Sequence, residues 1–134
     1  KKVITFFVDK DIKILIIGSN DKKNIIQYFV NEKVINLTNK TDFSLLGGLI
    51  KKSILVIGMD SFPAQYSLLL NKPTIILMSG IEETSQWYSL KDTVVIIKKE
   101  TDCSPCYKSN GCKSMKCLDI KPEEAIKTCQ NFIG

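Results

Sequence analysis

The chain alternates short apolar runs with stretches of helical spacing, and this alternation limits the possible folds more than any other feature. The apolar runs begin near residues 12, 34, 54, 74 and 94, at nearly equal intervals. Strands that alternate with helices are typical of βαβ units, which form a parallel sheet with helices on both faces. The sequence therefore predicts an α/β fold with a Rossmann-like parallel sheet.

The individual elements follow from the period of the apolar positions. We expect strands at residues 12–17, 34–37, 54–57, 74–78 and 94–97. We expect helices at residues 21–31, 42–51, 63–70 and 122–133, a helix tail over residues 3–8, and an irregular segment or short helix at 82–90. Residues 54–57 are apolar throughout, which favours a strand covered on both faces, so this strand is predicted to be central.

Composition narrows the class of protein. The net charge is +5, with 19 lysines and no arginine, and the lysines are scattered as pairs instead of forming one patch. Nucleic-acid binding is therefore not expected.

No apolar run reaches the length of a membrane span, and no signal peptide is recognisable, so we expect a cytoplasmic protein. The chain contains no histidine, which excludes a histidine base or ligand within it. Because it begins inside a helical pattern, we expect it to be a piece of a longer protein.

The turn after the predicted strand at 54–57 contains polar side chains that would lie at the carboxyl end of that strand. Gly58 allows a sharp turn after the strand at 54–57, and Asp60 and Ser61 follow it. Pro63 is favoured in the first turn of a helix. A helix beginning at this point would offer N–H groups and a positive dipole to an anion, where open α/β sheets bind ligands. The alternative is that Asp60 and Ser61 only cap the helix.

Four cysteines follow the last predicted strand, where the composition changes. Cys103, Cys106, Cys112 and Cys117 have the spacing C-x2-C-x5-C-x4-C and lie among turn-forming residues. Four thiolates close together suit a structural zinc or iron site, whereas two disulfides or unpaired thiols are the alternatives. The change in composition predicts a sheet-forming half-domain over residues 1–100, followed by a metal loop and C-terminal helix over 101–134. The fifth cysteine, Cys129, is expected in the core.

Taken together, these segments resemble the carboxyl-terminal half of bacterial heptosyltransferases of the ADP-heptose (lipopolysaccharide core) family. The resemblance rests on IKILIIGSNDKK (12–23), KVINLTNKTDFSLLGGLIKKSILVIGMDSF (33–62), LLLNKPTIILMSG (68–80) and DCSPCYKSNGCKSMKCLDIKPEEAI (102–126). The cysteine cluster is similar to that of the protein O-heptosyltransferase branch. The order and spacing of the four segments, more than any one of them, carry the resemblance.

The resemblance implies a GT-B glycosyltransferase with two Rossmann-like halves, of which residues 1–100 would be the nucleotide-sugar-binding one. The donor would be an ADP-heptose-like nucleotide-diphosphate sugar, and the acceptor a saccharide or a protein. Asp60 would hold sugar hydroxyls, and Ser61 and the N–H groups from Phe62 onward would hold the diphosphate. Asp21, after Gly18, would lie near the ribose, and Thr41 near the base. The catalytic base would belong to the amino-terminal half of the same protein, so the segment alone is expected to be inactive.

The sequence departs from the family pattern at two positions of this turn. Phe62 occupies the place of a glycine that lets backbone approach the diphosphate, and Gln65 occupies the place of a histidine. Glutamine can donate a hydrogen bond but carries no charge. Two alternatives therefore remain open: a transferase of the same build that uses a UDP or GDP donor, and a non-catalytic binding module stabilised by its metal.

Overall fold

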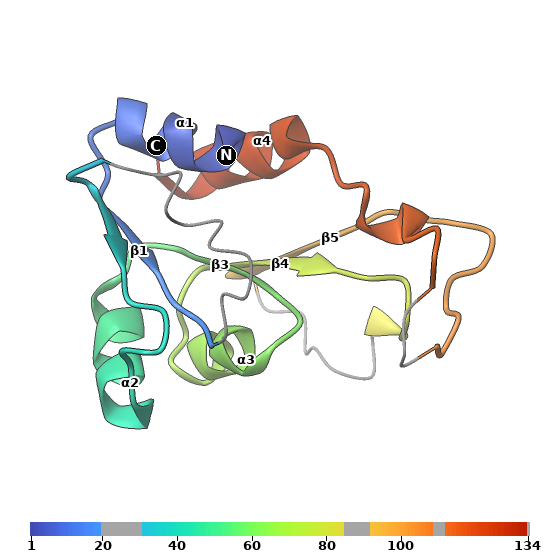
Figure 1. Ribbon diagram of the computed structural model, residues 1–134, viewed down its shortest axis with the longest axis horizontal. Coiled ribbons are helices and arrows are strands. Elements are labelled where there is room, and N and C mark those ends of the chain that lie inside the picture. The colour runs from blue at the N-terminus through green and yellow to red at the C-terminus, as the bar shows by residue number, and fades with distance from the viewer. Residues whose placement is uncertain (20–30, 85–91, 109–111, 134) are drawn as a thin grey trace. The chain divides into compact units, whose positions relative to one another are not determined.

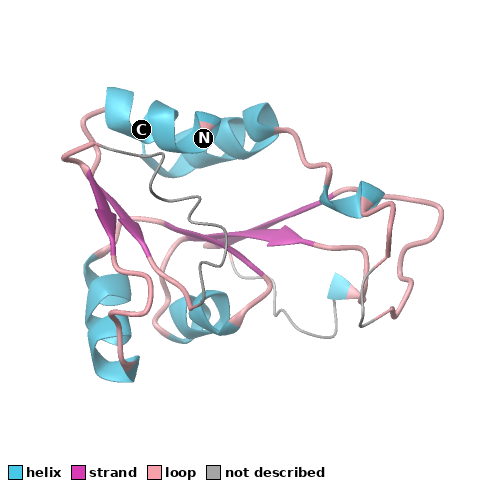
Figure 2. Cartoon of the chain, viewed as in Figure 1, coloured by secondary structure: helices cyan, strands magenta, loops and turns pink. Residues whose placement is uncertain are grey.

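The computed structural model describes residues 1–19, 31–84, 92–108 and 112–133. The described part contains four α-helices and five β-strands that alternate along much of the chain (Figure 1, Figure 2). All strand pairs are parallel, so the α/β, Rossmann-like class predicted from the sequence is confirmed. The predicted helix at 21–31, except its last residue, and most of the predicted segment at 82–90 lie outside the described residues.

The chain divides into two compact units, residues 1–46 and 47–134, and each is described by itself. This division reflects packing, whereas the predicted division at residue 100 reflects a change in composition and stays a prediction. Helix α2 (Phe43–Lys52) carries the chain from the first unit into the second. It begins after Asp42, whose carboxylate accepts the Leu45 N–H at 2.7 Å in the manner of an N-cap.

The first unit contains helix α1 (Lys2–Asp9) and two paired strands. Strands β1 (Ile14–Ile16) and β2 (Val34–Asn36) pair in parallel, with Ile14 opposite Val34. Phe7 is the buried residue of α1. These elements match the helix tail and the first two strands expected from the sequence, although β1 is shorter than its apolar run.

The second unit is built on a three-stranded parallel sheet in the order β3-β4-β5. Strand β3 is Val56–Met59, β4 is Thr74–Met78 and β5 is Val94–Lys98. Helix α3 (Phe62–Leu69) and helix α4 (Pro122–Ile133) lie over opposite faces of this sheet (Figure 1), and a short 3-10 helix, η3 (Lys116–Leu118), precedes α4. The core on the α3 face joins Ala64 to Ile76, Met78 and Val94.

The sequence predicts a central strand at residues 54–57, whereas within the second unit the middle strand is β4. Ile54 is 57% exposed and precedes β3, which is an outer strand of the described three-stranded sheet. In β4, Ile75 and Ile76 on opposite faces are both fully buried. Both segments are continuous apolar runs, so the run alone could not distinguish them. The expected burial of Cys129 is confirmed, since this side chain is fully buried on α4.

Candidate functional site

A pocket of about 200 Å³ opens where strands β3 and β4 end. The register pairs Met59 with Leu77, so the two parallel strands end at the same edge of the sheet and the segments that follow them meet there. The pocket is lined by Met59, Asp60, Met78, Ser79, Ile81 and Glu82. This is the position at which open α/β sheets bind their ligands.

The charged groups that line this pocket are both acidic. Asp60 and Glu82 each contribute a carboxylate, and none of its six lining residues is a lysine. Carboxylates accept hydrogen bonds from hydroxyl groups and repel phosphate oxygens. The pocket is therefore suited to a small group rich in hydroxyls and is unsuited to a diphosphate.

Helix α3 begins beside the pocket, directly after Asp60. Ser61 is the N-cap, with extended backbone, and its carbonyl accepts the Gln65 N–H at 3.1 Å. The Ser61 hydroxyl donates to the Met59 carbonyl at 3.1 Å and does not cap the helix. Pro63, in the first turn, has no N–H, so the start of α3 presents one donor fewer than an ordinary helix.

The two departures from the family pattern lie on this same helix. Phe62 is its first residue, 54% exposed, and its ring lies against Tyr66 with the centroids 5.6 Å apart. Gln65 is partly buried one turn further along the helix. An aromatic side chain at the first position keeps a ligand further from the helix backbone than a glycine would.

The other predicted donor residues belong to the first unit. Gly18 follows β1 with φ +150°, and its carbonyl accepts the Asn39 N–H at 2.9 Å, which extends the pairing of β1 and β2. Thr41 is partly buried just before α2. Asp21 lies outside the described residues. Asp60, Ser61, Phe62 and Gln65 are thus brought together, whereas Gly18 and Thr41 are described only within their own unit.

The cysteine segment, residues 101–118, is hydrogen-bonded to the stretch of chain that follows β4 and lines the pocket. The Cys106 N–H donates to the Gly80 carbonyl at 3.1 Å, and the Tyr107 N–H donates to the Ile81 carbonyl at 2.8 Å. Ser104 and Cys117 pack so closely on Gly80 that a Cβ at this position would lie 2.9 Å from the Ser104 Oγ. The segment therefore lies directly behind residues 79–82, which we call the pocket wall.

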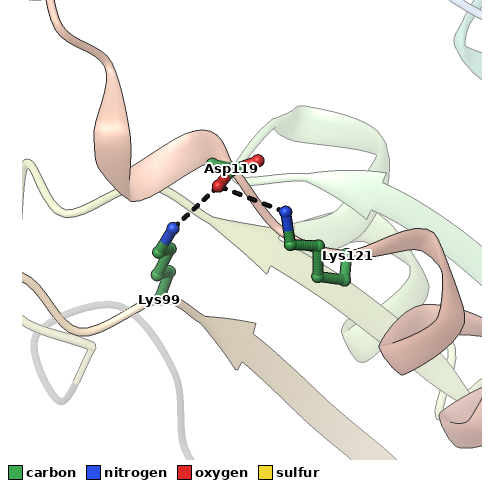
Figure 3. A network of polar contacts seen from close by, with 3 residues as sticks. All are labelled: Lys99, Asp119 and Lys121. Carbon is green, nitrogen blue, oxygen red and sulfur yellow. Dashed lines mark hydrogen bonds and ion pairs between the residues drawn. The ribbon is translucent and has the colours of Figure 1, made fainter.

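An ion pair joins the two ends of the cysteine segment. Lys99, after β5, and Asp119, after η3, are joined by an Nζ–Oδ2 contact of 2.9 Å, and Lys121 lies 3.5 Å from the same oxygen (Figure 3). The hydrogen bond from Lys99 is the main cause that lowers the pKa of Asp119 below its ordinary value. The ion pair closes the segment into a loop at its base.

Comparison with protein-family models matches residues 1–117 to glycosyltransferase family 9 (heptosyltransferase). The chain belongs to this family. The match includes β1 to β5, the Asp60 turn and all four cysteines of the segment, and ends before α4. Searches of curated proteins and of solved structures found no match. Membership identifies a sugar transferase, and the resemblance inferred from the sequence is confirmed at this level.

Ser79 and Glu82 line the pocket but are not among the residues predicted from the sequence. The signal was present in the expected parallel sheet, because residues that follow adjacent parallel strands lie at one edge. Applying it required the knowledge that β3 and β4 are neighbours, with Met59 opposite Leu77. Ser61 occupies the N-cap position, but its hydroxyl makes no cap hydrogen bond, and Asp60 lines the pocket.

The five cysteines of the chain form no disulfide, and four of them, Cys103, Cys106, Cys112 and Cys117, lie in the cysteine segment. Among the described residues, no three cysteine, aspartate or glutamate side chains come close enough to hold one ion. The thiol of Cys112 lies near the Ser114 hydroxyl and accepts the Met115 N–H, and these contacts lower its pKa and favour the metal-binding thiolate. Zinc or iron at this segment stays a prediction.

Within residues 1–19, 31–84, 92–108 and 112–133, no helix has the length and apolar character needed to cross a bilayer.

Proposed function

We propose that this chain is the donor-binding half of a transferase that moves a heptose, or a similar sugar, from a nucleotide-diphosphate sugar to a saccharide or protein acceptor. The observation that carries the proposal is the acidic pocket beside the start of α3. A nucleotide-diphosphate sugar has a polyhydroxy end and an anionic centre. The acidic pocket suits the polyhydroxy end, and the start of α3 suits the anionic diphosphate. Family 9 membership supports the reaction class.

The division of roles within the site follows from charge. Asp60 accepts hydrogen bonds from sugar hydroxyls in the pocket, where carboxylates would repel phosphate. The diphosphate lies at the start of α3, where backbone N–H groups and the helix dipole offset the charge that develops on the leaving nucleotide. The Ser61 hydroxyl takes part once it exchanges its bond to the Met59 carbonyl for a phosphate oxygen.

On α3, Gln65 donates a neutral hydrogen bond to the nucleotide in place of a charged one. The resemblance also assigns Asp21 to the ribose and Thr41 to the base, and these two assignments stay predictions from the sequence. The catalytic base is supplied by the amino-terminal half of the protein, so the 134-residue chain binds donor but transfers no sugar. A turnover assay in which the isolated chain forms product above a protein-free control would contradict this part of the proposal.

The assignment of Asp60 is tested with two ligands and a matched control. Asp60→Ala should weaken binding of ADP-heptose about tenfold, because it removes a hydrogen bond to a charged group. Binding of ADP should stay unchanged, because ADP lacks the sugar. Glu83→Ala is the control, since Glu83 adjoins Glu82 and carries the same charge but does not line the pocket. Calorimetric titration measures both affinities, and circular dichroism verifies the fold.

Four outcomes distinguish the hypotheses. Loss of ADP-heptose affinity in Asp60→Ala alone supports the sugar pocket. Equal affinities in all three proteins would remove Asp60 from the site. Tighter binding of UDP or GDP than of ADP would indicate the alternative donor, and binding of no nucleotide would favour a non-catalytic module, for which the exposed Phe62 ring at the helix start is the supporting observation.

A structural zinc or iron ion on the cysteine segment is the second part of the proposal. Its support is the set of four thiols on one short segment and the position of Cys106 and Cys117, which both adjoin Gly80. Cys103 and Cys112 would have to move closer to them, since no three potential ligands gather among the described residues. Thiolate ligands at all four places would leave no open position for substrate.

The metal is tested on protein purified in reducing buffer. Elemental analysis should give about one zinc or iron per chain, because thiolate ligation survives a reductant that would open disulfides. A quadruple replacement of the four cysteines by serine should lose the metal and serves as the matched control. A chain without metal, whose thiols react only after reduction, would support disulfides instead.

A further inference from the structure

Gly80 is held between the sheet and the cysteine segment in the second unit. It is buried and follows β4, and its neighbours Ser79 and Ile81 both line the pocket. A Cβ built on Gly80 would lie 2.9 Å from the Ser104 Oγ and 3.1 Å from the Cβ atoms of Ser104 and Cys117. Contacts this close mean that a side chain at position 80 must displace the Ser104 hydroxyl and move Ser104 or Cys117 by a few tenths of an ångström.

The backbone conformation of Gly80 does not itself require glycine. Among the described glycines, Gly18 alone has a positive φ. An alanine at position 80 would therefore meet no backbone strain, and its cost would come from contact with the cysteine segment. Gly80 is a glycine because the segment packs against it.

The contacts around Gly80 also fix the pocket wall. The two carbonyls that accept hydrogen bonds from Cys106 and Tyr107 belong to Gly80 and Ile81, which are consecutive residues of that wall. Two hydrogen bonds to adjacent carbonyls orient a short loop more firmly than one, since both peptide planes are held. Between the end of β4 and Glu82, the wall is thus positioned by the cysteine segment.

We propose that the cysteine segment positions the sugar pocket. Its hydrogen bonds to the Gly80 and Ile81 carbonyls hold the backbone of the pocket wall, which carries the lining side chains of Ile81 and Glu82. The identity of the ligand rests on the proposed function. The coupling between the cysteine segment and the pocket wall rests on the contacts at Gly80. A change that moves the segment away from Gly80 shifts the wall and weakens binding of the sugar end of the donor. The nucleotide end, which lies at α3, is left unaffected.

The experiment compares two glycine variants of the chain. Gly80→Ala inserts a methyl group into the contact with Ser104 and Cys117, whereas Gly48→Ala places one in open space on α2 and is the matched control. The double variant Gly80→Ala/Ser104→Ala removes the nearest clashing atom, the Ser104 Oγ, and should restore part of the wild-type behaviour. Circular dichroism and thermal unfolding establish that each variant folds.

Amide hydrogen exchange provides the first readout and needs no ligand. Gly80→Ala should exchange roughly tenfold faster in a peptide that covers residues 103–108, because the overpacked contact opens the hydrogen bonds that the Cys106 and Tyr107 N–H groups donate. Gly48→Ala should match the wild type in this peptide. Unchanged exchange in Gly80→Ala would overturn the proposal whatever the ligand is.

Binding of ADP-heptose and of ADP provides the second readout. In Gly80→Ala the dissociation constant for ADP-heptose should rise about tenfold and that for ADP should not change, and the Ser104→Ala replacement should reverse part of the rise. Faster exchange with an unaltered ADP-heptose affinity would overturn the positioning role. If the wild type binds neither ligand, the proposed donor is wrong, while faster exchange in Gly80→Ala would still support the coupling of segment and wall.

Discussion

Strand β4 and the cysteine segment are held in place by different kinds of interaction. Ile75 and Ile76 of β4 are fully buried on the two faces of the sheet, and the strand is paired with β3 and β5 along its length. In the cysteine segment, by contrast, Tyr107, Met115 and Leu118 are exposed. It is fastened by two hydrogen bonds to the pocket wall and by an ion pair at its base.

This difference separates what stabilises the fold from what shapes the site. Burial of apolar side chains is non-directional and supplies most of the stability of a domain. Hydrogen bonds and close contacts are directional and weaker in net effect, but they fix the position of a loop. In this chain the apolar strand provides the frame, and the polar segment behind Gly80 adjusts the pocket at its edge.

The largest effect should follow from removing apolar volume in β4. Ile76→Ala should lower the free energy of unfolding by about 2–5 kcal/mol, since it leaves a cavity beside Ala64, Met78 and Val94. Leu118→Ala in η3, where the side chain is 39% exposed, should change it by about 0.5 kcal/mol or less. Denaturant unfolding followed by circular dichroism measures both values.

A graded variant strengthens this test. Ile76→Val should cost only about 0.5–1.5 kcal/mol, because one methylene is removed in place of three carbons. If Leu118→Ala proves as costly as Ile76→Ala, the cysteine segment contributes a core of its own and the contrast between the two regions is lost.

Most of the second unit's frame could be predicted from the sequence, because apolar periodicity records which side chains are buried. Strand β4 and helix α4 begin and end at the predicted residues, and α3 differs by one residue at each end. The order of the strands in the sheet could not be predicted from apolar periodicity. Ile54–Ile57 and Thr74–Met78 are both apolar runs, and only its pairing with β3 and β5 makes β4 the middle strand of the second unit's sheet.

The residues of the candidate site could be predicted only where they lie on a single continuous turn of the chain. Asp60, Ser61 and Pro63 form a single turn, so their role at a helix start could be read directly. Glu82 joins Asp60 through the neighbouring strand, and Gly80 meets Ser104 across more than twenty residues of sequence. Such contacts depend on the packing of distant segments, which leaves no periodic signal in the sequence.

A smaller effect should distinguish buried hydroxyl groups in the two regions. The Ser67 and Thr74 oxygens lie 2.8 Å apart in the core, and Ser67 also donates to the Ala64 carbonyl at 2.6 Å. Ser67→Ala should therefore cost about 1–2 kcal/mol of unfolding free energy. The Ser104 hydroxyl oxygen is buried without a hydrogen-bond partner among the described residues, so Ser104→Ala should be neutral or stabilising by up to about 1 kcal/mol.

Thermal and denaturant unfolding of the two alanine variants decide this comparison. Thr74→Val adds a second check in the core, because the Thr74 hydroxyl lies 2.8 Å from both the Ser67 hydroxyl and the Lys72 carbonyl and has one proton to donate to either. Combined with Ser67→Ala it should cost less than the sum of the single changes, since the two residues share a contact. A destabilised Ser104→Ala variant would mean that its hydroxyl has a partner in the folded protein.

The smallest effect concerns the ion pair at the base of the cysteine segment, and it should depend on pH. The hydrogen bond from Lys99 lowers the pKa of Asp119 in the folded chain, so the unfolded carboxyl, with a pKa of about 3.9, binds its proton first as the pH falls. The contribution to stability is therefore complete above about pH 4 and is lost as the pH falls through the lower folded pKa. Asp119→Asn should lower Tm slightly at pH 7, less in high salt because the pair is exposed, and the difference from wild type should vanish in acid. Because the other carboxylates titrate equally in both proteins, the difference in Tm between them reports on Asp119 alone. A difference that persists unchanged at acid pH would show that Asp119 acts through packing and not through its charge.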